Sequence, residues 1–171
     1  SASVEVLQDV PGTRQVRIDA DNTATDLNKV LNHAVKAGVT AAVLTGVTGG
    51  RTDHTLWNLS LLKTYADRLQ LQIIDDYCQI RLLLAGTETH FSAHPGRHLS
   101  LSPLTGNVCG VTTEGLRWPL LSEDLIAGER DGISNEVVKS PVMIRVAGPG
   151  DLLLMMHREA GSAAIEAFDP P

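Results

Sequence analysis

The sequence predicts an α/β protein in which a parallel-sheet α/β domain, incomplete in this chain, is followed by an antiparallel β-sandwich domain. Two observations predict this layout. Strand-like and helix-like patterns alternate in the first half of the chain, whereas from Asp75 onward short apolar runs separated by turn residues replace the helical period. With 171 residues, 43% of them hydrophobic, the chain can form one large core or two small ones. We expect the domains to cover residues 1–76 and 77–171.

The alternation begins with a strand at residues 15–18, which the turn-forming residues 19–22 end. A helix is expected next, because Thr23 or Thr25 can cap it and apolar residues then recur at helical spacing. Gly38 is expected to end this helix.

The next elements complete a β-α-β-α-β order. Residues 41–44 form a continuous apolar run, which is typical of a strand buried on both faces. A second helix is expected from about His54 to Leu69, with Leu56 on its apolar side, and a strand follows at residues 71–74. This order predicts right-handed crossovers and a parallel sheet.

The second half reads as a series of short strands, because turn residues such as Gly, Pro and Asn interrupt it at short intervals. The strands are expected at residues 81–84, 98–101, 108–111, 136–139, 142–146 and 151–156.

Charge and composition exclude several classes of function. A net charge of −6 argues against a nucleic-acid partner, which needs a basic surface. No apolar run is long enough to span a membrane, and no targeting signal precedes the first strand. Cys78 and Cys109 are too far apart for a metal knuckle and too few for a disulfide scaffold, so a cytoplasmic protein is expected.

The first polar motif lies at the start of the first helix, where Thr25 precedes Asp26 and Lys29. Asp26 and Lys29 are three residues apart and therefore share one helix face. A carboxylate beside an ammonium at a helix start suits a magnesium ion and a phosphate that the ion bridges. A solvated capping turn with an ion pair explains the same residues.

The second motif follows the buried strand and comprises Thr48, Gly49, Gly50, Arg51 and Asp53. Paired glycines between a strand and a helix let backbone amides approach an anion closely. The guanidinium group suits phosphate oxygens, and the carboxylate is a hard ligand for a divalent cation. An ordinary turn with Asp53 as the helix N-cap is the alternative. The spacing fits neither a Walker loop nor a dinucleotide fingerprint.

Both motifs are expected at the same sheet edge, because ligands of open parallel sheets bind beyond the carboxyl ends of the strands. Asp26 and Asp53 are then candidate magnesium ligands, and Lys29 and Arg51 are candidate phosphate contacts.

In their order along the chain, four blocks of residues resemble thiamine pyrophosphokinases. The blocks are Thr25-Asp26 with Lys29, residues 49–56 with Asn58-Leu59, residues 110–120, and residues 132–136. The similarity extends over nearly the whole chain.

The resemblance implies an N-terminal catalytic domain, a C-terminal thiamine-binding β-sandwich and a homodimer with active sites between subunits. It implies transfer of pyrophosphate from ATP, with Mg²⁺, to the hydroxyl group of thiamine, giving thiamine diphosphate and AMP. Thr25, Thr48, Gly49 and Gly50 would then lie at the nucleotide. Thiamine contacts would come from Trp118, Ser134 and Asn135. An indole can stack on a cationic ring, and serine and asparagine can hydrogen-bond an aminopyrimidine. A core tryptophan and a plain turn explain the same three residues.

The chain departs from the family pattern at its beginning. A Gly-Asp-x-Asp-Ser motif whose aspartates bind magnesium is absent, and Ser1 reads as the final serine of such a motif. We therefore expect this polypeptide alone to be catalytically impaired. Two alternatives stay open: a pyrophosphokinase for another heterocyclic alcohol, such as a hydroxymethylpterin, and a non-catalytic thiamine-binding module.

Overall fold

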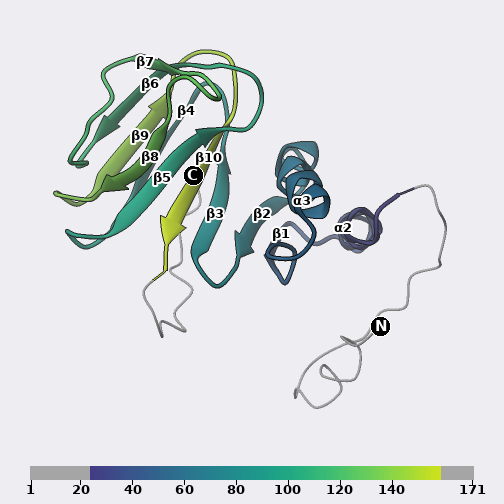
Figure 1. The fold of residues 1–171 in the computed structure, drawn as a ribbon. Helices are drawn as coiled ribbons and strands as arrows, with labels where there is room; N and C mark the ends of the chain where they lie inside the picture. Colours follow the sequence, from purple (N-terminus) through teal and green to yellow (C-terminus); the bar gives the residue numbers. More distant parts are fainter. Residues whose placement is uncertain (1–23, 159–171) are drawn as a thin grey trace.

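The computed structural model describes residues 24–158 and shows two helices on one face of a long sheet, whose far end forms a sandwich with a second sheet (Figure 1). The expected strand at residues 15–18 lies outside the described residues, as does Ser1. The helices are α2 (Asp26–Lys36) and α3 (Thr52–Thr64). The strands are β1 (Ala41–Thr45), β2 (Gln70–Ile74), β3 (Cys78–Leu83), β4 (Thr87–Phe91), β5 (His98–Pro103), β6 (Val108–Glu114), β7 (Glu123–Leu125), β8 (Gly132–Glu136), β9 (Val142–Val146) and β10 (Leu152–His157).

Helix α2 begins where the sequence predicts. Thr25 is its N-cap, and the Thr25 hydroxyl accepts a hydrogen bond from the Asn28 amide at 3.4 Å. The helix ends at Lys36, and Gly38 follows with a φ of +80°, a left-handed conformation that suits glycine.

Helix α3 is shorter than expected and begins earlier. The Arg51 carbonyl already accepts the Thr55 amide at 3.0 Å, and the chain leaves the helix after Thr64. The expectation that Leu56 lies on the apolar side is wrong, because Leu56 is exposed and the polar Asn58 is buried instead. Asn58 is buried because it bonds the neighbouring loop, a contact that periodicity alone does not reveal.

The main sheet continues across the expected domain boundary. Its strand order is β1-β2-β3-β10-β5-β8, and among these described strands only the β1–β2 pair is parallel. Strand β3 turns back after β2 and pairs with it antiparallel, Ile73 lying opposite Ile80. The expected parallel sheet is therefore one end of a mixed sheet.

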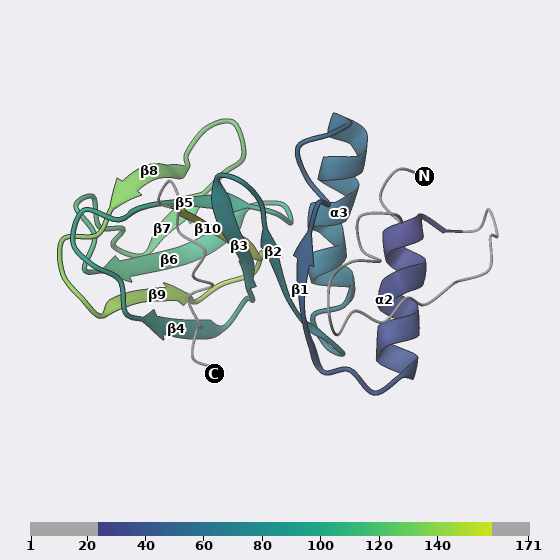
Figure 2. The same ribbon diagram turned by 90° about the horizontal axis from the view of Figure 1, so that it is seen from below.

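The second sheet has the order β4-β9-β6-β7 and packs over the far half of the first sheet (Figure 2). Apolar side chains from both sheets, such as Leu99, Leu154 and Ile144, form a core between them. This confirms the expected fold class of an α/β unit followed by a β-sandwich. The strand expected at residues 136–139 is wrong in position, because β8 ends at Glu136 and Val137 makes only an isolated bridge.

A second core lies between the helices and the first sheet, where Leu61, Leu62 and Tyr65 of the α3 region pack on Leu71 and Ile73.

Strand β1 does not have the expected burial on both faces. Its Leu44 faces the helices, whereas Val43 remains 46% exposed. The helices cover one face only in the described part of the protein. No helix among residues 24–158 is long and apolar enough to cross a membrane.

An ion pair joins the helical layer to the sandwich. Lys63, in the last turn of α3, lies 2.8 Å from Asp151, which also accepts hydrogen bonds from the Ala85 amide and the Thr105 hydroxyl. Asp151 is 3% exposed. Burial raises the pKa of Asp151, but the hydrogen bonds from Lys63, Ala85 and Thr105 outweigh it and lower the pKa overall.

Candidate functional site

The glycine loop lies between β1 and α3, at the carboxyl end of the parallel strand pair. Gly49 has a φ of +83°, a conformation that favours glycine over any residue with a side chain. Among the described residues, no atom lies within 4 Å of a Cβ built at Gly49 or Gly50. In this part of the protein the space beside both residues is therefore open to a ligand.

Two side chains from other elements hold this loop. The side-chain nitrogen of the buried Asn58 donates to the Val47 carbonyl at 2.8 Å, and the Thr48 hydroxyl donates to the Asp75 carboxylate at 3.0 Å. Asp75 follows the last residue of β2 and also accepts the amides of Tyr77 and Cys78. The loop is thus fixed on both sides before any ligand arrives.

Sequence reasoning did not assign Asp75 to the site. Its position directly after a parallel strand was the available signal, because such residues lie at the ligand-binding edge of the sheet. Asn58 was noted only as part of the family resemblance.

Arg51 and Asp53 form a two-point ion pair on the surface. The Arg51 Nε and Nη2 atoms lie 3.1 and 2.5 Å from the two carboxylate oxygens of Asp53. Hydrogen bonds from Arg51 lower the pKa of Asp53 to about 2, and the same pair raises the pKa of Arg51. Arg51, not Asp53, is the N-cap of α3, which corrects the alternative interpretation of this turn.

Asp26 and Lys29 share a helix face as expected, and their charged groups are 3.8 Å apart. Asp26 is fully exposed, whereas the Lys29 side chain is largely buried.

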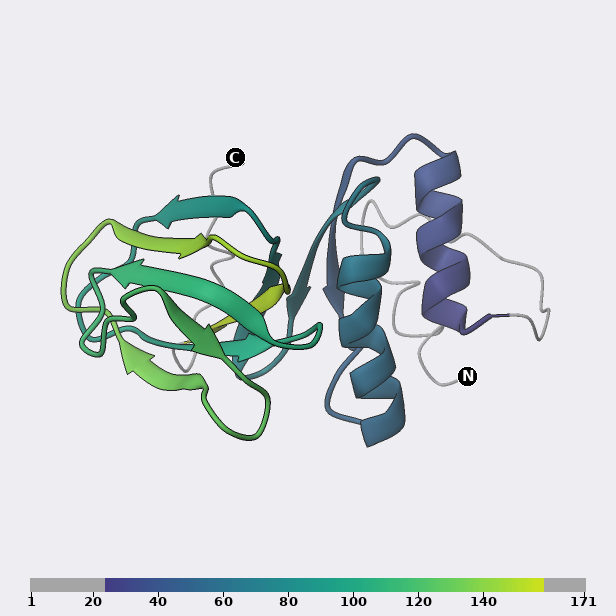
Figure 3. The same ribbon diagram turned by 90° about the horizontal axis from the view of Figure 1, so that it is seen from above.

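The described structure does not bring this first motif to the glycine loop. The Tyr65 hydroxyl donates to the Asn28 carbonyl at 3.0 Å, which places the start of α2 beside the C-terminal half of α3. Arg51 and Asp53 lie at the opposite, N-terminal end of α3. In Figure 3 the start of α2 lies alongside α3, between its two ends. The pairing of Asp26 with Asp53 around one magnesium ion stays a prediction.

Among residues 24–158, no three His, Cys, Asp or Glu side chains lie close enough together to hold a metal ion. A magnesium ion that keeps most of its waters needs only one or two protein carboxylates besides phosphate oxygens. The exposed carboxylate of Asp53, beside the open glycine loop, fits that donor requirement.

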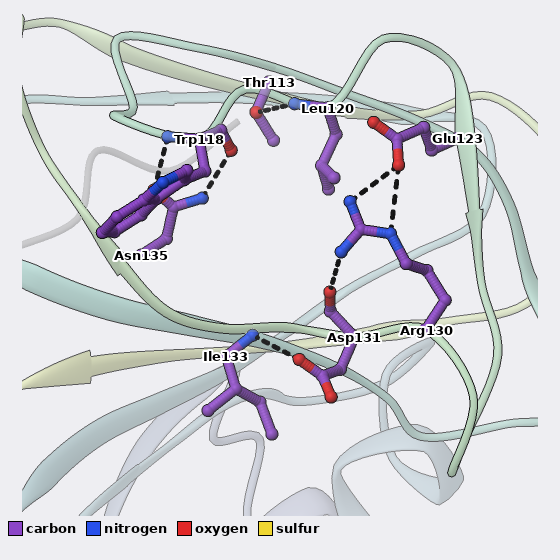
Figure 4. A network of polar contacts seen from close by, with 8 residues as sticks. All are labelled: Thr113, Trp118, Leu120, Glu123, Arg130, Asp131, Ile133 and Asn135. Carbon is purple, nitrogen blue, oxygen red and sulfur yellow. Dashed lines mark hydrogen bonds and ion pairs between the residues drawn. The ribbon is translucent and has the colours of Figure 1, made fainter.

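The remaining predicted residues lie together on the sandwich. Trp118 follows β6, and Asn135 belongs to β8. The Trp118 amide donates to the Asn135 side-chain oxygen at 3.1 Å, and the Asn135 side-chain nitrogen donates to the Trp118 carbonyl at 2.7 Å (Figure 4). The indole is 56% exposed, so Trp118 is not the core aromatic that the alternative interpretation expected.

Ser134 neighbours this pair with an unusual backbone. Its φ is +59°, and its amide donates to the buried Ser100 hydroxyl at 3.1 Å. The residue is exposed. Of the three predicted thiamine contacts, Trp118 and Asn135 are therefore bonded to each other, and Ser134 adjoins Asn135 in the chain; Trp118 and Ser134 are exposed.

Two family models match the chain. The model described as thiamin pyrophosphokinase, catalytic domain, matches residues 1–74, and the model described as thiamin pyrophosphokinase, vitamin B1 binding domain, matches residues 88–149. The glycine loop lies in the first range, and Trp118, Ser134 and Asn135 lie in the second.

Curated relatives carry the same name. Thiamine pyrophosphokinase 2 of Arabidopsis thaliana is 31% identical over 152 residues, which cover 83% of this chain and 55% of that protein. Thiamine pyrophosphokinase of Bacillus subtilis is 29% identical over 122 residues, which cover 71% of this chain and 57% of that protein. The chain thus spans a little more than half the length of these relatives.

Solved structures share the fold. The crystal structure of thiamine pyrophosphokinase from Bacillus subtilis superimposes with a TM-score of 0.72 at 25% identity, covering 81% of this chain and 65% of that one. The Candida albicans structure gives a TM-score of 0.62 at 16% identity, covering 78% of this chain and 52% of that one, a likeness of fold alone.

Proposed function

Because this chain belongs to the thiamine pyrophosphokinase family, we propose that it acts in the transfer of the terminal pyrophosphoryl group of ATP to the hydroxyl group of thiamine. The thiamine oxygen attacks the β-phosphorus, the bond from that phosphorus to the α-β bridging oxygen breaks, and AMP leaves. The hydroxyl proton is lost to a base. The observation that carries the proposal is the exposed Trp118 within the range matched by the vitamin B1 binding model.

The glycine loop is the proposed phosphate site. Backbone amides around Gly49 and Gly50 can donate to phosphate oxygens, and Arg51 adds a planar cation that suits two oxygens at once. Arg51 is paired with Asp53, so a phosphate that binds the same two guanidinium donors would displace the Asp53 carboxylate. The displaced carboxylate would then be available to a metal ion.

Mg²⁺ is the proposed cofactor, and it would neutralise charge on the transferred group. Asp53 is the proposed ligand at the loop, with Asp26 as the second. Lys29, which lies on α2, would bind a phosphate oxygen of the nucleotide. Asp26 and Lys29 lie near the start of α2, whereas Asp53 lies at the start of α3, and the two helix starts are displaced from each other along α3. For all three residues to bind one nucleotide, the nucleotide must span this displacement or α2 must shift along α3.

Thiamine is the proposed acceptor at the sandwich. The cationic thiazolium or the pyrimidine ring can stack on the exposed indole of Trp118, and the exposed Ser134 can hydrogen-bond the pyrimidine edge.

Assembly as a homodimer is also proposed. Four large apolar side chains of the sandwich are exposed, and a subunit interface would cover them: Trp118, Leu121, Ile133 and Val138. Both cysteines are free thiols, which supports a reducing, cytoplasmic location. Analytical ultracentrifugation tests the dimer; a purely monomeric protein at micromolar concentration contradicts it.

The test of the reaction is product analysis with thiamine, ATP and Mg²⁺, using the chain and any longer natural form of it. Thiamine diphosphate and AMP in equal amounts are expected. Thiamine monophosphate with ADP would contradict pyrophosphoryl transfer.

A non-catalytic thiamine-binding module is the second candidate, because the exposed Trp118 within the range matched by the vitamin B1 binding model is equally compatible with binding alone. Thiamine binding without any product from the longest natural form would establish this candidate instead.

A further inference from the structure

We infer that Asn135 positions Trp118 and does not itself contact thiamine. The inference rests on the proposed function, because it concerns the same thiamine site, and it replaces a direct substrate contact by a structural role. The two residues face opposite environments: Asn135 is 3% exposed, whereas Trp118 is 56% exposed.

The carboxamide of Asn135 continues a strand pairing that the backbone alone cannot complete. Leu116 and Val137 form an isolated antiparallel bridge, and the Arg117 amide donates to the Glu136 carbonyl at 2.8 Å. At the next position the Asn135 side chain takes the place of a backbone partner and bonds both the amide and the carbonyl of Trp118. The peptide that carries the indole is thereby fixed.

The hydrogen-bonding capacity of Asn135 is largely used in this role. Its side-chain oxygen accepts from the amides of Trp118 and Glu136, at 3.1 and 2.9 Å, which occupies both lone pairs. One amide hydrogen is donated to the Trp118 carbonyl. An aminopyrimidine amino group therefore finds no acceptor on this side chain.

Arg117 restricts the indole further. Its guanidinium lies 5.7 Å from the centre of the Trp118 ring, and it also pairs with Glu136 at 3.1 Å. One face of the indole thus carries a cation already. With the peptide held by Asn135, a planar ligand is directed to the other face.

The experiment uses tryptophan fluorescence, since Trp57 and Trp118 are the two tryptophans of the chain. In a Trp57→Phe background, emission and anisotropy report Trp118 alone. The variants are Asn135→Ala and Asn135→Asp, and the control is Asn107→Ala, an exposed asparagine of the same sandwich. Each protein is titrated with thiamine and, separately, with Mg²⁺ and ATP, and its thermal unfolding is recorded.

We expect Asn135→Ala to lower the anisotropy of Trp118 and to raise the thiamine Kd about tenfold. Asn135→Asp should weaken binding further, because a carboxylate oxygen would face the Trp118 carbonyl. Binding of Mg²⁺ and ATP should stay unchanged in both variants, which a general loss of structure would not allow. Asn107→Ala should resemble the parent.

Two results would overturn the inference: unchanged thiamine affinity in Asn135→Ala, or weaker binding with an unchanged Trp118 anisotropy, which would indicate direct contact. Failure of the proposed function looks different. In that case the parent protein itself shows no thiamine binding, whereas the anisotropy still reports whether Asn135 holds Trp118.

Discussion

The ammonium of Lys63 lies 2.8 Å from the carboxylate of Asp151, so the last turn of α3 is ion-paired to the segment that leads into β10. Asp151 is buried and Lys63 is half-exposed. This contact joins the layer that carries the glycine loop to the sandwich that carries Trp118.

Replacing Asp151 by Asn should lower the free energy of unfolding by about 2 kcal/mol, because a buried, charge-assisted hydrogen-bond set loses its charge. The exposed Asp67, which pairs with Arg68, provides the control Asp67→Asn, which should change little. The pKa of Asp151 is lowered in the folded state. Its contribution is therefore present above the ordinary carboxyl pKa and disappears as the pH falls through the lowered value. Chemical denaturation at several pH values measures both effects; equal losses in the two variants would refute the role of Asp151.

Gly115→Ala should destabilise the sandwich more than Gly128→Ala. Both residues have a φ near +80°, so both substitutions strain the backbone, by about 1 kcal/mol. A Cβ at Gly115 would also lie 2.4 Å from the Lys139 carbonyl oxygen, whereas a Cβ at Gly128 meets nothing within 4 Å. The difference in melting temperature between the two variants measures the effect of this close contact. Equal melting temperatures would show that the surrounding structure shifts to relieve it.

Thr48→Val should weaken phosphate binding while leaving stability nearly unchanged. The substitution keeps the shape of the side chain but removes the hydroxyl that bonds Asp75, so one side of the glycine loop is released. Thr64→Val, at the far end of α3, is the matched control. Titration with Mg²⁺ and ATP measures the effect. Wild-type affinity in Thr48→Val would mean that Asn58 alone holds the loop.

Arg51→Gln should raise the pKa of Asp53 from about 2 toward its ordinary value of 3.8, because the largest cause of the lowering is removed. Any stability from this exposed pair is present above the ordinary carboxyl pKa and is lost as the pH falls through about 2. Carboxyl NMR titration follows the change. Arg68→Gln, beside Asp67, is the control, and an unmoved Asp53 in Arg51→Gln would contradict the observed pairing.

The sequence predicts the elements of the fold well where local signals are strong. The Thr25 hydroxyl caps α2 as predicted, and the apolar run predicted to be a strand forms β1. Side-chain pattern could not reveal that β3 joins the parallel pair to the sandwich, because pairing across a turn leaves no periodicity of its own. Leu56 was wrongly predicted to lie on the apolar side for a related reason: the side of α3 that carries Asn58 is the side that packs against the loop.

The sequence predicts the individual site residues better than it predicts which of them lie close together. Thr48, Gly49, Gly50, Arg51 and Asp53 lie on one loop, as sequence order alone implies. Long-range hydrogen bonds decide the rest.

The contact between Tyr65 and Asn28 sets the start of α2 beside the C-terminal half of α3, and the carboxamide of Asn135 binds the peptide of Trp118. Neither partner can be read from spacing, because each contact joins residues that are distant in the chain.

Calorimetric titration with thiamine tests the central claim most directly, with a hydroxymethylpterin titrated in parallel. The account predicts saturable binding of thiamine, little heat from the pterin, and an affinity that Trp118→Ala reduces about tenfold. Trp57→Ala, which removes a similarly exposed tryptophan, should not reduce the affinity. Clear pterin binding without thiamine binding, or equal thiamine affinity in the two tryptophan variants, would contradict it.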